Sequence, residues 1–161
     1  MTIQVGDRLP QATFRVMTAD GPAARTTDDV FKGRKVVLIA VPGAFTPTCH
    51  RNHLPGYVEK AAEIRGRGID AIAVTSVNDV FVMDAWAKAS NADPDFVFLA
   101  DGNGDFAKAV GLTLDGTGFG LGVRSQRYSM LVDDGVVKAL NVEDTPSKAD
   151  VSGAEMLLKT L

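Results

Sequence analysis

The stretch VVLIAVPGAFTPTC, residues 36–49, decides the fold because it joins a buried strand to the start of a helix. Its first six residues, Val36 to Val41, are aliphatic and mostly β-branched, which is typical of a strand buried on both faces. Pro42 and Gly43 then predict a turn. Farther on, residues 54–65 repeat apolar side chains at helical spacing. A buried strand followed by an amphipathic helix predicts an α/β protein.

Pro55 interrupts the helical pattern near its start. Proline has no N–H to donate and its ring clashes with the preceding turn, so the sequence predicts a kink. The carbonyl of Arg51 is expected to lose its usual helical partner.

Strand and helix patterns alternate along the rest of the chain. The expected elements are strands over 70–75, 96–100, 127–132 and 136–142, and helices over 80–89, 105–110 and 152–161. Ser76 or Asn78 is expected to cap the helix over 80–89. That helix should end near Asn91 and Pro94, and Gly111 should end the next one.

The two last strands are expected to form a hairpin around Asp134-Gly135, a pair of residues that favours a tight turn. The order of elements predicts an α/β fold with a central mixed sheet flanked by helices. The length of 161 residues predicts a single domain over residues 1–161.

Composition excludes several classes of protein. Hydrophobic residues make up 45% and charged residues 23%, which is a globular balance. The net charge of −3 gives no electrostatic footprint for nucleic acid. The longest apolar run, Val36 to Phe45, is too short to cross a membrane. Residues 1–7 show neither a basic leader nor an apolar targeting region, so a cytoplasmic protein without membrane contact is expected.

The single cysteine, Cys49, carries the most informative chemistry. One cysteine excludes a disulfide within the chain and a C-x-x-C zinc or dithiol site. A cysteine in the first turn of a helix faces unpaired N–H groups, which favour the nucleophilic thiolate. Its pKa is therefore expected below the usual value of about 8.5. The alternative, that Cys49 is a small buried apolar residue, stays equally open on position alone.

The pattern Pro42-x-x-x-Thr46-x-x-Cys49 resembles the active-site signature of the peroxiredoxins. Residues 41–47 and 53–56 resemble the peroxiredoxin-5 subfamily in particular. The similarity continues through residues 5–10, 74–86 and 124–129. The resemblance implies a thioredoxin-like fold in which Thr46-x-x-Cys49 takes the place of the dithiol motif.

The resemblance also implies roles for four residues. Cys49 would attack the O–O bond of a peroxide and become a sulfenic acid. Arg124 would stabilise the thiolate and hold the peroxide oxygens through its rigid fork of donors. Thr46 would hydrogen-bond the peroxide, and Pro42 would close the substrate pocket against water. No cofactor and no metal are implied.

One departure from the subfamily concerns the second, resolving cysteine that relatives often carry near the C-terminus. The corresponding neighbourhood reads Lys148-Ala149-Asp150-Val151-Ser152, and Val151 cannot form a disulfide. The resemblance therefore implies a one-cysteine mechanism for reducing hydrogen peroxide and organic hydroperoxides. An external thiol, either glutathione with glutaredoxin or thioredoxin, would regenerate Cys49.

The resemblance further implies a homodimer, although Phe81, Met83 and Trp86 are more typical of a core than of an interface. An alternative function is a non-catalytic redox-sensing or holdase protein on the same fold. It requires an inert Cys49.

Three weaker patterns point elsewhere. Residues 102–107 fit G-x-G-x-x-A, which suggests a nucleotide site, but a helix-initiating turn explains them better. The glycines of residues 116–122 lack a phosphate-loop ending, and we expect them to allow a close backbone approach that positions Arg124. His50 and His53 could suggest a metal, but packing or surface roles are favoured because no carboxylate accompanies them.

Overall fold

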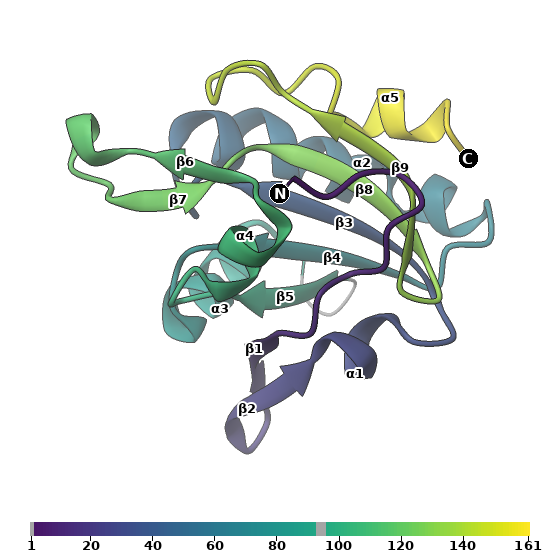
Figure 1. Ribbon diagram of the computed structural model, residues 1–161, viewed down its shortest axis with the longest axis horizontal. Coiled ribbons are helices and arrows are strands. Elements are labelled where there is room, and N and C mark those ends of the chain that lie inside the picture. Colours follow the sequence, from purple (N-terminus) through teal and green to yellow (C-terminus); the bar gives the residue numbers. More distant parts are fainter. Residues whose placement is uncertain (1, 93–95) are drawn as a thin grey trace.

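The framework of the molecule is a seven-stranded mixed sheet in the order β2-β1-β5-β4-β3-β8-β9. The computed structural model describes residues 2–92 and 96–161, apart from the side chain of Cys49. The strands are β1 (Thr13–Thr18), β2 (Gly21–Thr26), β3 (Lys35–Val41), β4 (Ala71–Ser76), β5 (Phe96–Ala100), β6 (Thr113–Asp115), β7 (Val123–Ser125), β8 (Tyr128–Asp133) and β9 (Val136–Val142). The helices are α1 (Thr27–Phe31), α2 (Leu54–Arg65), α3 (Val80–Ala89), α4 (Asp105–Val110) and α5 (Ala154–Leu158), with a π turn η1 (Cys49–His53) and a 3₁₀ turn η2 (Thr117–Phe119). Figure 1 shows the helices lying on both sides of the sheet.

Strand β3 lies in the interior of the sheet, between β4 and β8, and both of its faces are apolar. It runs parallel to β4 and antiparallel to β8, so the sheet is mixed as predicted. Every side chain from Val36 to Val41 is fully buried. Two separate cores explain this burial, one on each face of the sheet.

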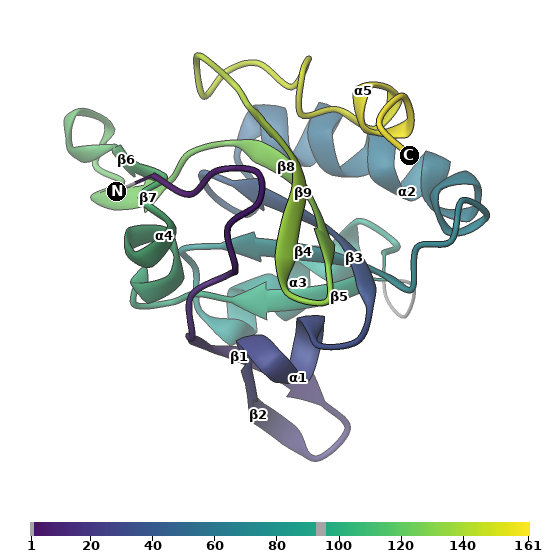
Figure 2. The same ribbon diagram turned by 45° about the vertical axis from the view of Figure 1, so that its right-hand side comes forward.

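The two cores use alternate residues of β3. Val37, Ile39 and Val41 pack against α2, α3 and α5. Val36, Leu38 and Ala40 pack in the core that α1, α4 and the N-terminal segment cover. Figures 1 and 2 both show α5 lying beside α2, so the C-terminal region covers the helix that follows Cys49.

Most of the predicted elements are confirmed. The strands and helices over 70–75, 80–89, 96–100, 105–110 and 136–142 lie within one residue of their expected bounds. Gly111 ends α4 in the left-handed conformation at φ 74°. Asp134 and Gly135 adopt φ values of 48° and 79°, which fit the expected tight turn between β8 and β9.

The predicted cap of α3 is wrong. Asp79 is the N-cap, and its carboxylate accepts the N–H of Val82 at 2.8 Å. Asn78 instead accepts the N–H of Ala44 at 2.9 Å and also contacts the hydroxyl of Ser76. α3 ends at Ala89, and the expected end near Asn91 holds, whereas Pro94 lies outside the described residues.

Several elements escaped prediction. Strands β1 and β2 form a hairpin, and α1 follows with a capping box between Thr26 and Asp29. The hairpin β6–β7 was also missed because each strand has three residues. The last helix is shorter than predicted, since α5 covers only Ala154–Leu158.

Pro55 is accommodated by the π turn η1, which lies directly before α2. A π turn changes the hydrogen-bond spacing of a helix locally, and such turns occur where the regular ladder is interrupted. Pro55 itself lies in the first turn of α2, where its missing N–H is tolerated, and the widened turn over Cys49–His53 precedes it.

Residues 102–107 form the helix-initiating turn that we expected. Gly104 adopts φ 74° before α4. The carboxylate of Asp101 accepts the N–H groups of Phe106 and Ala107 at 3.0 Å each. A pyrophosphate would need these same N–H groups, so the turn does not present a nucleotide site. In the described part of the chain, no helix has the length and apolarity to cross a membrane.

Candidate active site

The turn between β3 and η1 brings the predicted site residues to the carboxyl end of the central strand, where α/β proteins commonly place their sites. Pro42 and Gly43 are buried directly after Val41. The hydroxyl of Thr46 donates to the carbonyl of Gly43 at 2.7 Å. The N–H of His50 donates to the carbonyl of Thr46 at 2.8 Å, so helical hydrogen bonding starts at Thr46. Cys49 follows within this first turn, as predicted.

The backbone of the turn is held in a strained conformation. Phe45 adopts φ 63°, which is uncommon for a residue with a bulky side chain. The bond from Ala44 to Asn78 fixes the turn on one side of Phe45, and the Thr46–Gly43 bond fixes it on the other. Such strain persists only where surrounding contacts determine the conformation.

Arg124 reaches this turn from β7. Its Nε donates to the carbonyl of Leu121 at 2.8 Å, and its Nη1 lies 3.5 Å from the carbonyl of Pro42. A Cβ atom added at Gly43 would lie 3.1 Å from this Nη1 and 3.0 Å from the methyl group of Thr46. Gly43 therefore leaves room for both the guanidinium of Arg124 and the methyl group of Thr46.

The glycine-rich loop before Arg124 allows a close backbone approach, as predicted. The N–H of Gly116 donates to the carbonyl of Gly122 at 2.7 Å. A Cβ atom at Gly116 would lie 2.8 Å from the Cβ of Leu121, which is closer than real contacts allow. Because Leu121 also holds the Nε of Arg124, the glycines help to place the guanidinium.

A second arginine, Arg127, also lies beside the start of the helix, although no sequence pattern predicts a role for it. It directly precedes β8 and is only 2% exposed. Its Nη1 lies 2.9 Å from Nδ1 of His53, the last residue of η1. Arg124 thus approaches the turn before Cys49, whereas Arg127 approaches the turn that Cys49 opens.

Both histidines beside Cys49 have structural partners. Nδ1 of His50 accepts the indole N–H of the buried Trp86 at 3.1 Å, and its ring lies 5.5 Å from that of Phe45. Burial, with a further contribution from the charge of Arg127, lowers the pKa of His53 to about 3. These contacts agree with the packing roles that we favoured for both side chains. Among the described residues, no group of three or more His, Cys, Asp and Glu side chains is placed to hold a metal.

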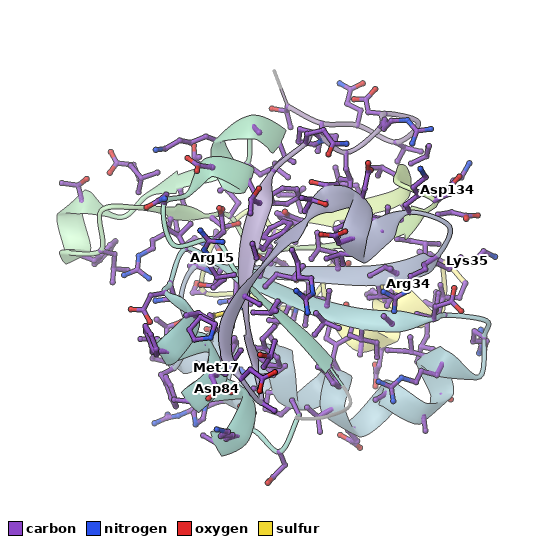
Figure 3. The ribbon with its side chains drawn as sticks, turned by 90° about the horizontal axis from the view of Figure 1, so that it is seen from below. Arg15, Met17, Arg34, Lys35, Asp84 and Asp134 are labelled. Atoms are coloured by element: carbon purple, nitrogen blue, oxygen red, sulfur yellow. The ribbon has the colours of Figure 1, made fainter. Side chains whose placement is uncertain are left out.

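A cavity of about 300 Å³ lies elsewhere, between the β1–β2 hairpin, α1 and α3. Met17 of β1 and Asp84 of α3 lie close together in Figure 3 and both line it, with Arg34. No residue of the 41–49 turn lines this cavity. The positions of Thr46, Arg124 and Arg127 therefore indicate where the reaction takes place, and the size of this cavity does not.

An α/β fold with a cysteine at the first helical turn after its central strand defines a thioredoxin-like thiol protein, and comparisons with known proteins agree. The Redoxin family pattern matches residues 4–158. Peroxiredoxin-2E-2, chloroplastic, from Oryza sativa subsp. japonica is 50% identical over 97% of this chain and 72% of its own length. Reduced Prx3 from Vibrio vulnificus in complex with H2O2 is 50% identical, with a TM-score of 0.93 and 98% of each chain covered. Peroxiredoxin 5 from Alvinella pompejana is 33% identical, with a TM-score of 0.87, covering 98% of this chain and 97% of its own.

The chain therefore belongs to the Redoxin family and, within it, to the peroxiredoxins. The expected thioredoxin-like fold and the resemblance to peroxiredoxin 5 are confirmed. Peroxiredoxins are thiol-dependent peroxidases, so the protein is an enzyme rather than a non-catalytic member of the fold.

Proposed function

We propose that the protein reduces hydrogen peroxide and small organic hydroperoxides through Cys49. The observation that carries this proposal is that the side chain of Thr46 and the guanidinium of Arg124 both lie against Gly43, six residues before Cys49. The relative from Vibrio vulnificus, crystallised in complex with H2O2, supports hydrogen peroxide as a substrate.

The chemistry follows from the polarity of each group. The Cys49 thiolate attacks one peroxide oxygen, the O–O bond breaks, and the second oxygen leaves as hydroxide or alkoxide and takes up a proton. The products are a Cys49 sulfenic acid and water or an alcohol. A guanidinium suits the leaving oxygen because it stays charged and offers several donors.

Thr46 and Pro42 complete the proposed substrate site. The Thr46 hydroxyl already donates to Gly43, so its free lone pair can accept the O–H of a hydroperoxide. Pro42 is buried next to Arg124 and has no N–H to solvate, so it limits water at the reacting atoms.

We assign separate roles to the two arginines. Arg124 lies on the Thr46 side and would hold the peroxide, whereas Arg127 lies on the His53 side and would add positive charge near the helix start.

Arg124→Lys keeps the charge but loses the fork, so kcat/KM for H2O2 should fall at least about tenfold, or about 1.4 kcal/mol.

Arg127→Lys is the matched comparison, because it makes the same replacement three residues away. Stopped-flow peroxide consumption should show the loss in both variants. The Cys49 pKa should rise more in the Arg127 variant, because lysine keeps the charge but lacks the fork that contacts both His53 and Pro146 and holds that charge near the helix start. If Arg124→Lys kept full activity, Arg124 would not be the residue that holds the peroxide, and that role would be assigned to Arg127.

We propose an external thiol as the reductant, since the 161 residues contain one cysteine. The thiol attacks the sulfenic acid, water leaves, and a second thiol releases Cys49 from the mixed disulfide. Peroxide consumption with glutathione and glutaredoxin, measured beside thioredoxin and its reductase, tests this step. If neither reducing system supported peroxide consumption, the proposed cycle would be contradicted.

A homodimer is the proposed assembly. Phe45, Phe81 and Phe119 are 45%, 65% and 85% exposed, so the core role expected for Phe81 is wrong, and these rings leave apolar surface for a partner. Phe45 and Phe81 follow the carboxyl ends of the parallel strands β3 and β4, and Phe119 lies in the loop before Arg124. Sedimentation should give a molecular mass twice the 17.0 kDa of one chain. The substitution Phe119→Asp should shift the population from dimer toward monomer. A wild-type monomer at micromolar concentration would contradict this assembly.

A further inference from the structure

A network of buried polar groups joins Arg127 to the C-terminal part of the chain. Besides its contact with His53, Arg127 donates from Nε and Nη2 to the carbonyl of Pro146 at 3.2 and 3.1 Å. On the other side of the imidazole ring, Nε2 of His53 lies 3.0 Å from the carbonyl of Ser152. His53 and Ser152 are 1% and 0% exposed, so the contacts of His53 with Arg127 and Ser152 form away from water.

The partners of His53 determine where its proton lies. A guanidinium nitrogen can only donate, so Nδ1 of His53 must accept from Arg127. The carbonyl of Ser152 can only accept, so Nε2 must carry the proton and donate to it. A neutral ring with the proton on Nε2 satisfies both contacts, and a second proton on Nδ1 would break the contact with Arg127.

The segment Glu143–Gly153 is anchored at several points around this ring. The hydroxyl of Tyr57 also donates to the carbonyl of Ser152, at 2.6 Å. One carboxylate oxygen of Glu143 accepts both the N–H and the hydroxyl of Ser152, at 2.7 and 2.6 Å. The N–H of Glu143 in turn donates to the carbonyl of Arg127 at 3.0 Å. The backbone and the guanidinium of Arg127 are thus tied to the same segment.

We propose that His53 is a positioning residue for the peroxidase reaction, which holds the Arg127 guanidinium in place and is itself held by the segment Glu143–Gly153. The inference rests on the proposed function, because it concerns the arginine on the Cys49 side of the site. His53 touches no reacting atom. It acts by fixing the direction of a charged group whose effect on the thiolate depends on distance.

Two substitutions of His53 separate its two contacts. The side-chain amide of Asn lies where Nδ1 lies, so His53→Asn can still accept from Arg127. The amide of Gln reaches the position of Nε2, so His53→Gln can still donate to Ser152 but offers no acceptor at the Nδ1 position. His53→Gln should lower kcat/KM for H2O2 at least about tenfold and raise the Cys49 pKa, as read from thiolate absorbance. His53→Asn should stay within about threefold of wild type.

Tyr57→Phe is the control, because it removes another bond to the same Ser152 carbonyl without touching Arg127. It should lower the melting temperature and leave both the rate constant and the Cys49 pKa unchanged. Equal losses in the Asn and Gln variants, or an unchanged Cys49 pKa in His53→Gln, would overturn the proposal.

A measurement on the wild-type protein covers the case in which His53→Gln does not fold. Ring ¹⁵N NMR is readily assigned, since the chain has two histidines. His53 should remain neutral with its proton on Nε2 between about pH 8 and pH 5, as its low pKa requires. A proton on Nδ1 in this range would overturn the proposal. If the wild-type enzyme consumed no peroxide, the proposed function would fail, while this NMR result would still stand or fall by itself.

Discussion

Replacing Cys49 with serine lowers kcat/KM for hydrogen peroxide by at least about a thousandfold, or about 4 kcal/mol in the transition state. A serine hydroxyl has nearly the same size but stays protonated at neutral pH, so it cannot serve as the nucleophile. The chain has no second cysteine to replace it. Peroxide consumption under saturating reductant measures the loss.

Thr48→Ser is the matched control for this prediction. It changes the neighbouring residue but keeps the hydroxyl that donates to the carbonyl of Ser147 at 3.1 Å. The control should retain wild-type turnover and melting temperature. If Cys49→Ser retained more than a few per cent of wild-type turnover, Cys49 would not be the nucleophile.

Acid should destabilise the protein through His53. The pKa of this residue falls from about 6.5 in an unfolded chain to about 3 in the folded protein, chiefly because the ring is buried. The unfolded state therefore binds one more proton than the folded state at pH values between these two. Stability that is fully present above pH 6.5 is lost as the pH falls toward 3, by up to about 1.4 kcal/mol per pH unit.

The variant His53→Asn isolates this contribution, because asparagine does not titrate. The free energy of unfolding, measured in urea between pH 7.5 and pH 4.5, should fall more steeply for wild type than for the variant. Carboxylates with lowered pKa values, such as Asp29 and Asp115, contribute equally to both proteins and cancel in the difference. Parallel curves for the two proteins would show that His53 is not buried in the neutral form.

Long apolar patterns made the centre of the fold predictable from sequence. The strand over residues 36–41 and the helix over 54–65 are read directly, because one is continuously apolar and the other has helical spacing. The β1–β2 hairpin was missed because β2 alternates between half-buried and exposed residues and contains Gly21 and Pro22. Its place in the sheet depends on pairing with β1, which is a tertiary contact.

The candidate site was predictable where it is local in sequence. Pro42, Thr46 and Cys49 share one turn, so their spacing is informative. The contacts of Arg127 and His53 join residues 74 apart, and those of His53 and Ser152 join residues 99 apart. A signal existed, because Arg127 directly precedes a strand, but only the pairing of β8 with β3 shows that it lies beside the helix start.

The capping error at α3 has a similar cause. Ser76, Asn78 and Asp79 are all good caps by residue type. Asn78 is engaged by the turn before Cys49, through Ala44, which leaves Asp79 to cap the helix. Asn78 holds the turn before Cys49 and is therefore not available as the helix cap that its residue type favours.

Intact-mass spectrometry after one equivalent of peroxide, without reductant, tests the one-cysteine cycle most directly. The chain offers Cys49 no second thiol, so its sulfenic acid should persist until a thiol arrives or more peroxide oxidises it. We expect a monomer mass increased by one oxygen, trapped by dimedone, and by two and three oxygens in excess peroxide as activity falls. An unchanged mass, or quantitative conversion to a disulfide-linked dimer after one equivalent, would contradict it.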